Sequence, residues 1–173
     1  MKNWKLPNLT KDKQGITSDW ELLNQELIEG VQLKEVKSVI KDNGFLTEVF
    51  RKEWFSEFQD VDQVFQIRMN PGAISGWHAH ESTWDRIFVN LGTIKVILYD
   101  SRKESPTYGK INEFRLSEFR SGIVTIPPKV FHAVFNIAEK ESALLNIVDV
   151  AYNYTDPDHW RIPIDDPSIP YKF

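Results

Sequence analysis

The sequence predicts an all-β fold of the sandwich or barrel type, formed by a single domain of 173 residues. After Gly30 the chain consists of short apolar runs separated mostly by Gly, Pro, Asn and Asp, which is the pattern of strands joined by turns. One run, residues 94–99, is nearly continuous in apolar residues, as expected of a strand covered on both faces. With 41% hydrophobic residues, the chain can bury a full core between such strands.

The region before the strands is expected to form an arm and one short helix. Residues 1–16 are polar and have no periodicity, so they indicate an arm. A helix is predicted over residues 18–29, because Ser18 and Glu21 match a capping box and Gly30 ends the pattern. Its apolar stripe at helical spacing consists of Trp20, Leu22, Leu23, Leu27 and Ile28.

The β domain is predicted over residues 31–173, and residues 1–30 form the arm and helix before it. Each predicted strand is a run of apolar and β-branched residues bounded by turn formers. The runs are residues 31–36, 45–50, 64–69, 86–89, 93–99, 123–126, 133–137 and 144–148. No internal repeat or low-complexity segment interrupts them, so we expect one core.

Composition excludes several classes of partner and site. The net charge is −4 and the basic residues are interspersed with acidic ones, which argues against a nucleic-acid partner. There are no cysteines, so disulfides and thiolate metal ligands are excluded. No run approaches the length of about 18 apolar residues that a membrane span needs. We therefore expect a cytoplasmic protein with neither a nucleic-acid nor a membrane partner.

Two stretches place histidines where a β fold could bring them together. They are Gly72-x5-His78-Ala79-His80-x4-Asp85-x6-Gly92 and Gly122-x4-Pro127-x4-His132-x3-Asn136. Side chains at i and i+2 of a strand share a face, so His78 and His80 point the same way if residues 75–80 are extended. Three imidazoles and one carboxylate suit one divalent Fe, Mn, Ni or Zn ion, which makes His78, His80, Asp85 and His132 a candidate ligand set.

These two stretches resemble the paired motifs of the cupins, with Asp85 where glutamate is more frequent and Lys129 where glycine is. Over about residues 28–173 the chain resembles the dTDP-4-dehydrorhamnose 3,5-epimerase family within the cupins. The matching pieces are Asp42-Asn43-Gly44-Phe45-x2-Glu48-x-Phe50, Gly76-Trp77-His78, Asp100-x-Arg102-x2-Ser105-Pro106-Thr107-Tyr108-Gly109, Ile126-Pro127-x4-His132 and Asp165-Asp166-Pro167-x-Ile169. The fold that this resemblance implies is a cupin double-stranded β-helix, or jelly roll, that is usually a homodimer.

The resemblance also implies an enzyme that needs no cofactor. This family abstracts a proton next to the 4-keto group of a nucleotide-linked 6-deoxy sugar and returns it on the other face. His78 matches the family's base, and a neutral imidazole suits that role because its ordinary pKa of about 6.5 lies near working pH. Asp166 matches the carboxylate that orients this histidine and stabilises its charged form. Tyr152 or Tyr154 is expected to supply the general acid.

Several family positions carry other residues in this chain. The arginine that contacts the substrate phosphate is Asn43 here, the arginine three positions before the base is Ser75, and the lysine on the next strand falls at Asp85. The family's proton-returning tyrosine aligns with Asn146. The residues expected to contact the nucleotide-sugar substrate are Glu48, Phe50, Gln66, Arg68, Arg86, His132 and Asn146.

Two other functions fit the same residues. One is a metal-dependent cupin that binds or transforms a small polar ligand, which His80 favours because the family has no histidine there. The other is a cupin that binds sugars without catalysis. Structural roles are also open: Asp85 could form an ion pair with a neighbouring basic residue. Trp77 is expected to pack on the face opposite His78, and His159 to be solvated in a polar loop.

Overall fold

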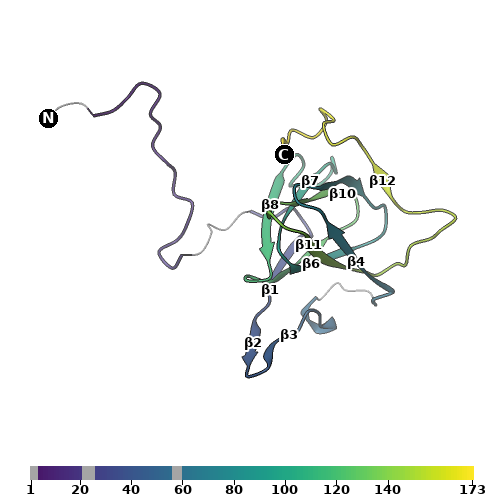
Figure 1. Cartoon of the computed structure of the whole chain (residues 1–173). Coiled ribbons are helices and arrows are strands. Elements are labelled where there is room, and N and C mark those ends of the chain that lie inside the picture. Colours follow the sequence, from purple (N-terminus) through teal and green to yellow (C-terminus); the bar gives the residue numbers. More distant parts are fainter. Residues whose placement is uncertain (1–3, 21–25, 56–59) are drawn as a thin grey trace.

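The structure, a computed structural model, describes residues 4–20, 26–55 and 60–173. In these residues the strands form two five-stranded antiparallel sheets and a separate hairpin (Figure 1). The first sheet has the order β1 (Gln32–Glu35), β9 (Gly122–Ile126), β6 (Asp85–Leu91), β11 (Ser142–Val148) and β4 (Gln63–Met69). The second has the order β12 (Trp160–Arg161), β5 (Ile74–Ala79), β10 (Val130–Asn136), β7 (Thr93–Asp100) and β8 (Ile111–Ser117). The hairpin pairs β2 (Ser38–Lys41) with β3 (Gly44–Thr47), and a 3-10 helix, η1 (Lys52–Trp54), follows.

One apolar core lies between the two sheets. Ile87 and Val89 of β6 belong to the same buried cluster as Val96 and Leu98 of β7, and none of the four is more than 3% exposed. They recur at every second position, which is the period of a strand with one face turned inward. The all-β cupin fold class is therefore confirmed, and each of the predicted runs overlaps one of the observed strands.

The C-terminal tail, residues 162–173, covers the outer face of the second sheet, and it is the yellow end of the chain in Figure 1. Trp77 of β5 and Ile97 of β7 are both fully buried there, where they pack with Ile169. Strand β7 is therefore covered on both faces, as its apolar sequence predicted. The packing role predicted for Trp77 is also confirmed.

The helix predicted over residues 18–29 is wrong in the part of that range that the structure describes. Residues 18–20 and 26–30 form turns and irregular chain, and residues 21–25 lie outside the described residues. The backbone N–H of Ile28 donates to Asn112 Oδ1 at 2.8 Å, and that of Glu29 donates to Thr107 Oγ1 at 2.9 Å. Long-range partners thus replace helical hydrogen bonds and override local propensity. Among the described residues, no helix has the length and apolarity to cross a membrane.

The loop after β7 is organised by the carboxylate of Asp100, which is fully buried. It accepts hydrogen bonds from Arg102 Nε at 2.8 Å and from the hydroxyls of Ser105 and Thr107 at 2.7 and 2.6 Å. Arg102 Nη2 also donates to the carbonyl of Glu29 at 2.8 Å, which ties the N-terminal segment to this loop. Burial alone would raise the pKa of Asp100, but these hydrogen bonds hold that pKa well below its ordinary range.

Gly76, two residues before His78 in β5, packs so closely against β10 that a Cβ does not fit. A Cβ at this position would lie 2.4 Å from the Cβ and 2.7 Å from the Cα of Ala133. We expect Gly76→Ala to lower the free energy of unfolding by about 1–3 kcal/mol, because β5 has to move away from β10. Urea unfolding measures the change. Gly15→Ala is the control, since nothing lies within 4 Å of a Cβ there, and equal losses in both variants would contradict the prediction.

Candidate active site

Two neighbouring strands of the second sheet place two histidines side by side. His78 of β5 and His132 of β10 are Cα partners in the antiparallel register, and their ring centroids are 4.1 Å apart. His132 is 1% exposed and lies between Val130 and Val134, which belong to the core between the sheets. Residues directly opposite in an antiparallel pair share a face, so His78 also points inward. Its side chain keeps partial contact with solvent.

Asp85, at the start of β6 in the first sheet, faces these histidines from across the core. Its Oδ2 lies 3.2 Å from His80 Nε2 and 3.5 Å from His132 Nε2. Its Oδ1 accepts a hydrogen bond from Asn146 Nδ2 of β11 at 2.6 Å. The structure therefore brings together His78, His80, Asp85 and His132, the residues that the two sequence motifs group.

A fourth histidine joins the cluster from outside both motifs. The ring centroid of His159 lies 4.9 Å from that of His78 and 5.0 Å from that of His80. Its Nε2 is buried and has no hydrogen-bond partner among the described residues. The expectation that His159 is solvated is therefore wrong. The physical reason is the contact that its neighbour Asp158 makes with the end of β5.

Asp158 holds the loop before β12 against residues 80–83. Its carboxylate accepts hydrogen bonds from the backbone N–H groups of Glu81 at 2.6 Å, Ser82 at 2.9 Å and Thr83 at 3.2 Å. Its backbone carbonyl contacts Nδ1 of His80. Burial alone would raise the pKa of Asp158, but the hydrogen bonds hold it well below its ordinary range. These contacts span 75 to 78 sequence positions, so no local pattern indicates them.

Burial keeps imidazoles of the cluster neutral. It is the largest cause that lowers the pKa of His78, and the neighbouring histidines lower that pKa further. Burial also lowers the pKa of His132, against the opposing effect of Asp85. The pKa of His159 falls to about 4, through burial first and then through Arg161. At neutral pH these three rings are uncharged and each keeps one nitrogen lone pair, the state in which imidazole acts as a base or as a metal ligand.

The inward-facing residue of strand β4 near the cluster is not one of the predicted substrate contacts. Gln66 and Arg68 are exposed, on the face of β4 that points away from the core. Phe65 is the Cα partner of Asn146 and therefore shares its inward face. The alternation of Phe65 with the core residues Ile67 and Met69 is the sequence signal that could have identified it.

The outer face of the first sheet carries three more of the predicted substrate contacts, Glu48, Phe50 and Arg86. Glu48 accepts a hydrogen bond from Arg51 Nε at 2.7 Å, and Phe50 stacks on Phe55 with a centroid distance of 6.0 Å. Arg86 is 1% exposed, and its guanidinium carbon lies 6.0 Å from the Phe55 ring centroid. Burial lowers the pKa of Arg86 to about 10, so the side chain stays charged at neutral pH. None of these described side chains lies on the inward face that carries the histidines.

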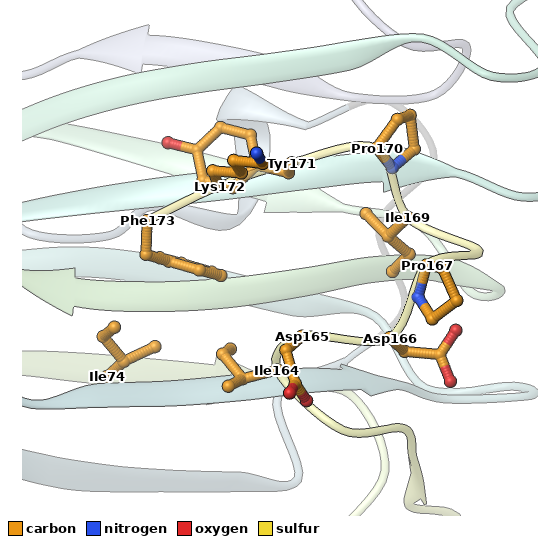
Figure 2. A pocket seen from close by; sticks show the side chains of 10 residues that line it. All are labelled: Ile74, Ile164, Asp165, Asp166, Pro167, Ile169, Pro170, Tyr171, Lys172 and Phe173. Carbon is orange, nitrogen blue, oxygen red and sulfur yellow. The ribbon is translucent and has the colours of Figure 1, made fainter.

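The residues expected to orient the base and to return the proton also lie apart from the cluster. Asp166 accepts hydrogen bonds from the backbone N–H and hydroxyl of Ser168 at 2.9 and 2.5 Å. Figure 2 shows Asp166 at the edge of a pocket of about 750 Å³ that is formed largely by the C-terminal tail. Tyr152 and Tyr154 are 48% and 86% exposed, and their rings contact each other. The structure describes all of these residues and does not bring Asp166 or the tyrosines to His78.

The sequence matches an epimerase family and two named relatives. The sequence model of the dTDP-4-dehydrorhamnose 3,5-epimerase family matches residues 25–173. The chain is 34% identical over 139 residues to the probable low-salt glycan biosynthesis epimerase Agl13 of Haloferax volcanii, and this match covers 80% of the chain and 89% of the relative. It is 29% identical over 147 residues to the spore coat polysaccharide biosynthesis protein SpsL of Bacillus subtilis, over 85% of the chain and 97% of the relative.

A solved structure shows the same architecture. The dTDP sugar isomerase of Desulfovibrio desulfuricans G20 superposes with a TM-score of 0.77 at 25% sequence identity. The match covers 84% of this chain and 91% of that chain. The similarity therefore extends over the two sheets that carry the histidine cluster and is not confined to a single motif.

Proposed function

The chain belongs to the dTDP-4-dehydrorhamnose 3,5-epimerase family, and we propose that it epimerises a nucleotide-linked 4-keto-6-deoxy sugar with His78 as the general base. The reaction removes a proton from a carbon next to the 4-keto group and returns it on the opposite face. The ketone stabilises the resulting negative charge as an enolate, so the reaction requires neither a redox cofactor nor a carrier group. A neutral base within reach of that carbon is the principal requirement.

The position of His78 supports this proposal most directly. Its ring belongs to the inward cluster but keeps partial contact with solvent, whereas the neighbouring His132 is 1% exposed. A general base has to come within hydrogen-bond distance of the substrate proton, which a fully buried ring cannot do. Burial and the surrounding histidines lower the pKa of His78, so the ring is neutral at working pH. The same effects weaken it as a base, so its protonated form needs a nearby negative charge to stabilise it.

Asp85 is the carboxylate that stabilises the charge acquired by His78 in this proposal. Its Oδ2 lies 3.5 Å from His132 Nε2, and the His132 ring is in turn 4.1 Å from that of His78. A negative charge that is only 2% exposed acts over such distances with little screening by water. The roles of Asp166 as orienting carboxylate and of Tyr152 or Tyr154 as acid rest on the family pattern, and they require these segments to approach His78.

Solvent isotope exchange tests the proposal. The full-length chain is incubated in D2O with a dTDP-linked 4-keto-6-deoxyglucose, and mass spectrometry and NMR follow the deuterium content of the carbons next to the keto group. We expect enzyme-dependent deuterium incorporation at one or both carbons. Exchange no faster than in the protein-free control, across a panel of 4-keto-6-deoxy sugars on different nucleotides, would contradict the epimerase proposal.

We propose that the protein is a homodimer, and the β2–β3 hairpin supports this. The hairpin projects from the sheets in Figure 1. Ile40 and Phe45 are Cα partners in the hairpin and are 88% and 69% exposed. Ile40 and Phe45 thus form an exposed apolar patch of the kind that marks an interface, and Val39 and Leu46, each 58% exposed, expose apolar surface on the opposite face of the hairpin.

The double variant Ile40→Ser/Phe45→Ser is expected to shift the protein from dimer to monomer, because it removes the two most exposed apolar side chains of the hairpin. Size-exclusion chromatography with light scattering measures the molar mass at several concentrations. Ser38→Ala/Thr47→Ala, at the polar end of the same hairpin, is the matched control. A wild-type chain that is monomeric at all concentrations would contradict the dimer.

A further inference from the structure

The hydrogen-bond partners of two histidines determine which of their nitrogens carries the hydrogen. His132 Nδ1 lies 3.1 Å from the carbonyl of Val130, and His80 Nδ1 contacts the carbonyl of Asp158. A carbonyl oxygen only accepts hydrogen bonds, so in both rings the hydrogen is on Nδ1. In the neutral form of each ring, the lone pair is therefore on Nε2.

Both lone pairs point to the same carboxylate oxygen. His80 Nε2 and His132 Nε2 lie 3.2 and 3.5 Å from Asp85 Oδ2, and His132 Nε2 is buried without a hydrogen-bond partner among the described residues. Three electron-pair donors that face one another in a buried place repel unless a proton or a metal ion lies between them. Two imidazoles fixed by backbone carbonyls, with Nε2 atoms that converge beside a carboxylate, are the usual arrangement of a metal site.

The third imidazole of the group is His78. One ring nitrogen from each of His78, His80 and His132 forms a set in which all atoms lie within 4.8 Å of one another. Donors bound to one ion at about 2.1 Å are about 3.4 Å apart in tetrahedral geometry. The distances from Asp85 to His80 and His132 already match that spacing, and the ligand atom of His78 lies within 4.8 Å of those of the other two histidines.

We propose that His78, His80, His132 and Asp85 bind one divalent transition-metal ion. Three imidazoles and one carboxylate suit Zn²⁺, Ni²⁺, Fe²⁺ or Mn²⁺ and leave room for a water or substrate oxygen on a five- or six-coordinate ion. This binding goes beyond the proposed epimerisation and does not rest on it. The two functions use the same imidazole of His78, so the metal-bound chain lacks the free base.

Asp158 is the positioning residue of this site. Its backbone carbonyl holds His80 in the tautomer that presents Nε2. Its carboxylate accepts five hydrogen bonds, one from the N–H of Glu81 and two each from the N–H and hydroxyl groups of Ser82 and Thr83. Outer partners of this kind typically contribute about 10- to 100-fold to metal affinity. The loop that carries Asp158 and His159 thus connects the C-terminal segment to the proposed metal site.

Metal binding by the full-length chain tests the proposal without any assay of activity. The chain is purified without an affinity tag, stripped with a chelator and dialysed against Zn²⁺, Ni²⁺, Fe²⁺ or Mn²⁺ separately, and the bound metal is counted by elemental analysis. We expect about one ion per chain with Zn²⁺ or Ni²⁺, and a rise in unfolding temperature on binding. Absence of stoichiometric binding with all four ions would overturn the proposal, whatever the exchange assay shows.

Two histidine variants of the same cluster provide a matched comparison. His80→Gln removes a ligand and is expected to weaken binding by at least about 100-fold, since even outer partners account for up to that much. His159→Gln removes an imidazole that is not in the ligand set and is expected to keep one ion per chain. Circular dichroism of the metal-free variants establishes that both fold. Equal loss of binding in the two variants, or unchanged binding in His80→Gln, would overturn the assigned ligands.

Discussion

Replacement of His78 by alanine is expected to lower the rate of solvent deuterium incorporation by about 10²- to 10⁴-fold, the contribution that a positioned general base typically makes. The variant removes the only imidazole of the cluster that both occupies the family's base position and keeps contact with solvent among the described residues. The measurement is the exchange rate of a saturating 4-keto-6-deoxy nucleotide sugar in D2O. Thermal unfolding of the variant verifies that its fold is intact.

Substitutions around His78 separate the base from its neighbours. His159→Gln is expected to retain most of the exchange activity, because its ring contacts that of His78 without occupying the base position. His80→Gln is expected to keep measurable exchange while losing metal, which would show that the two functions of the cluster are separable. Wild-type exchange in His78→Ala would exclude this residue as the base.

The role of Asp166 has its own test. If the tail brings this carboxylate to His78 during catalysis, Asp166→Asn is expected to lower exchange and to spare metal binding, because Asp166 is not in the ligand set. Ser168→Ala is the control, since it removes the hydroxyl that donates a hydrogen bond to Asp166. An unchanged exchange rate in Asp166→Asn would leave Asp85 as the carboxylate that stabilises the protonated base.

The second large effect is expected on stability. Asp100→Ala should lower the free energy of unfolding by about 3 kcal/mol, because it leaves the donors of Arg102, Ser105 and Thr107 without their common acceptor. Urea unfolding at pH 7 measures the difference. Ser105→Ala removes a single donor from the same carboxylate and is expected to cost about 1 kcal/mol. An equal loss in both variants would contradict a network centred on Asp100.

The contribution of Asp100 is also expected to depend on pH. Its pKa in the folded chain is held below the value of about 3.9 that it has when unfolded. The folded state therefore favours the ionised form, and the resulting stability is fully present above about pH 4 and is lost as pH falls through the folded pKa. The difference in unfolding free energy between wild type and Asp100→Asn should be largest at pH 7 and should shrink towards pH 3. A difference that stays constant would mean that charge does not matter at this position.

The Asp100 network also explains which part of the family resemblance is structural. The string Asp100-x-Arg102-x2-Ser105-Pro106-Thr107 is the most specific of the matching pieces, yet its polar side chains bond one another and Glu29. They therefore hold the loop after β7 and the segment before β1 together. A strong sequence match thus identifies the family through its scaffold, whereas the imidazoles able to accept a proton lie in the histidine cluster.

Local periodicity accounts for what the sequence by itself determined. Alternation along strands identifies the inward residues, because successive side chains of a strand point to opposite faces. It predicted that His78 and His80 share a face and that Trp77 packs on the opposite one, and the continuous apolar run of residues 94–99 predicted a strand covered on both faces. The spacing of the two motifs likewise grouped His80, Asp85 and His132 with His78, as the resemblance to the paired cupin motifs implies.

Only the tertiary structure decided the contacts that join distant segments. Asn146 bonds Asp85 across 61 positions, and Asp158 bonds residues 81–83 across 75 to 77. Neither contact leaves a local pattern, because strand register and loop docking are set by packing of the whole core. For the same reason the helix predicted before Gly30 is wrong. The backbone N–H of Ile28 donates to Asn112, 84 positions away, and burial of Ile28 in the core outweighs the helix propensity of this segment.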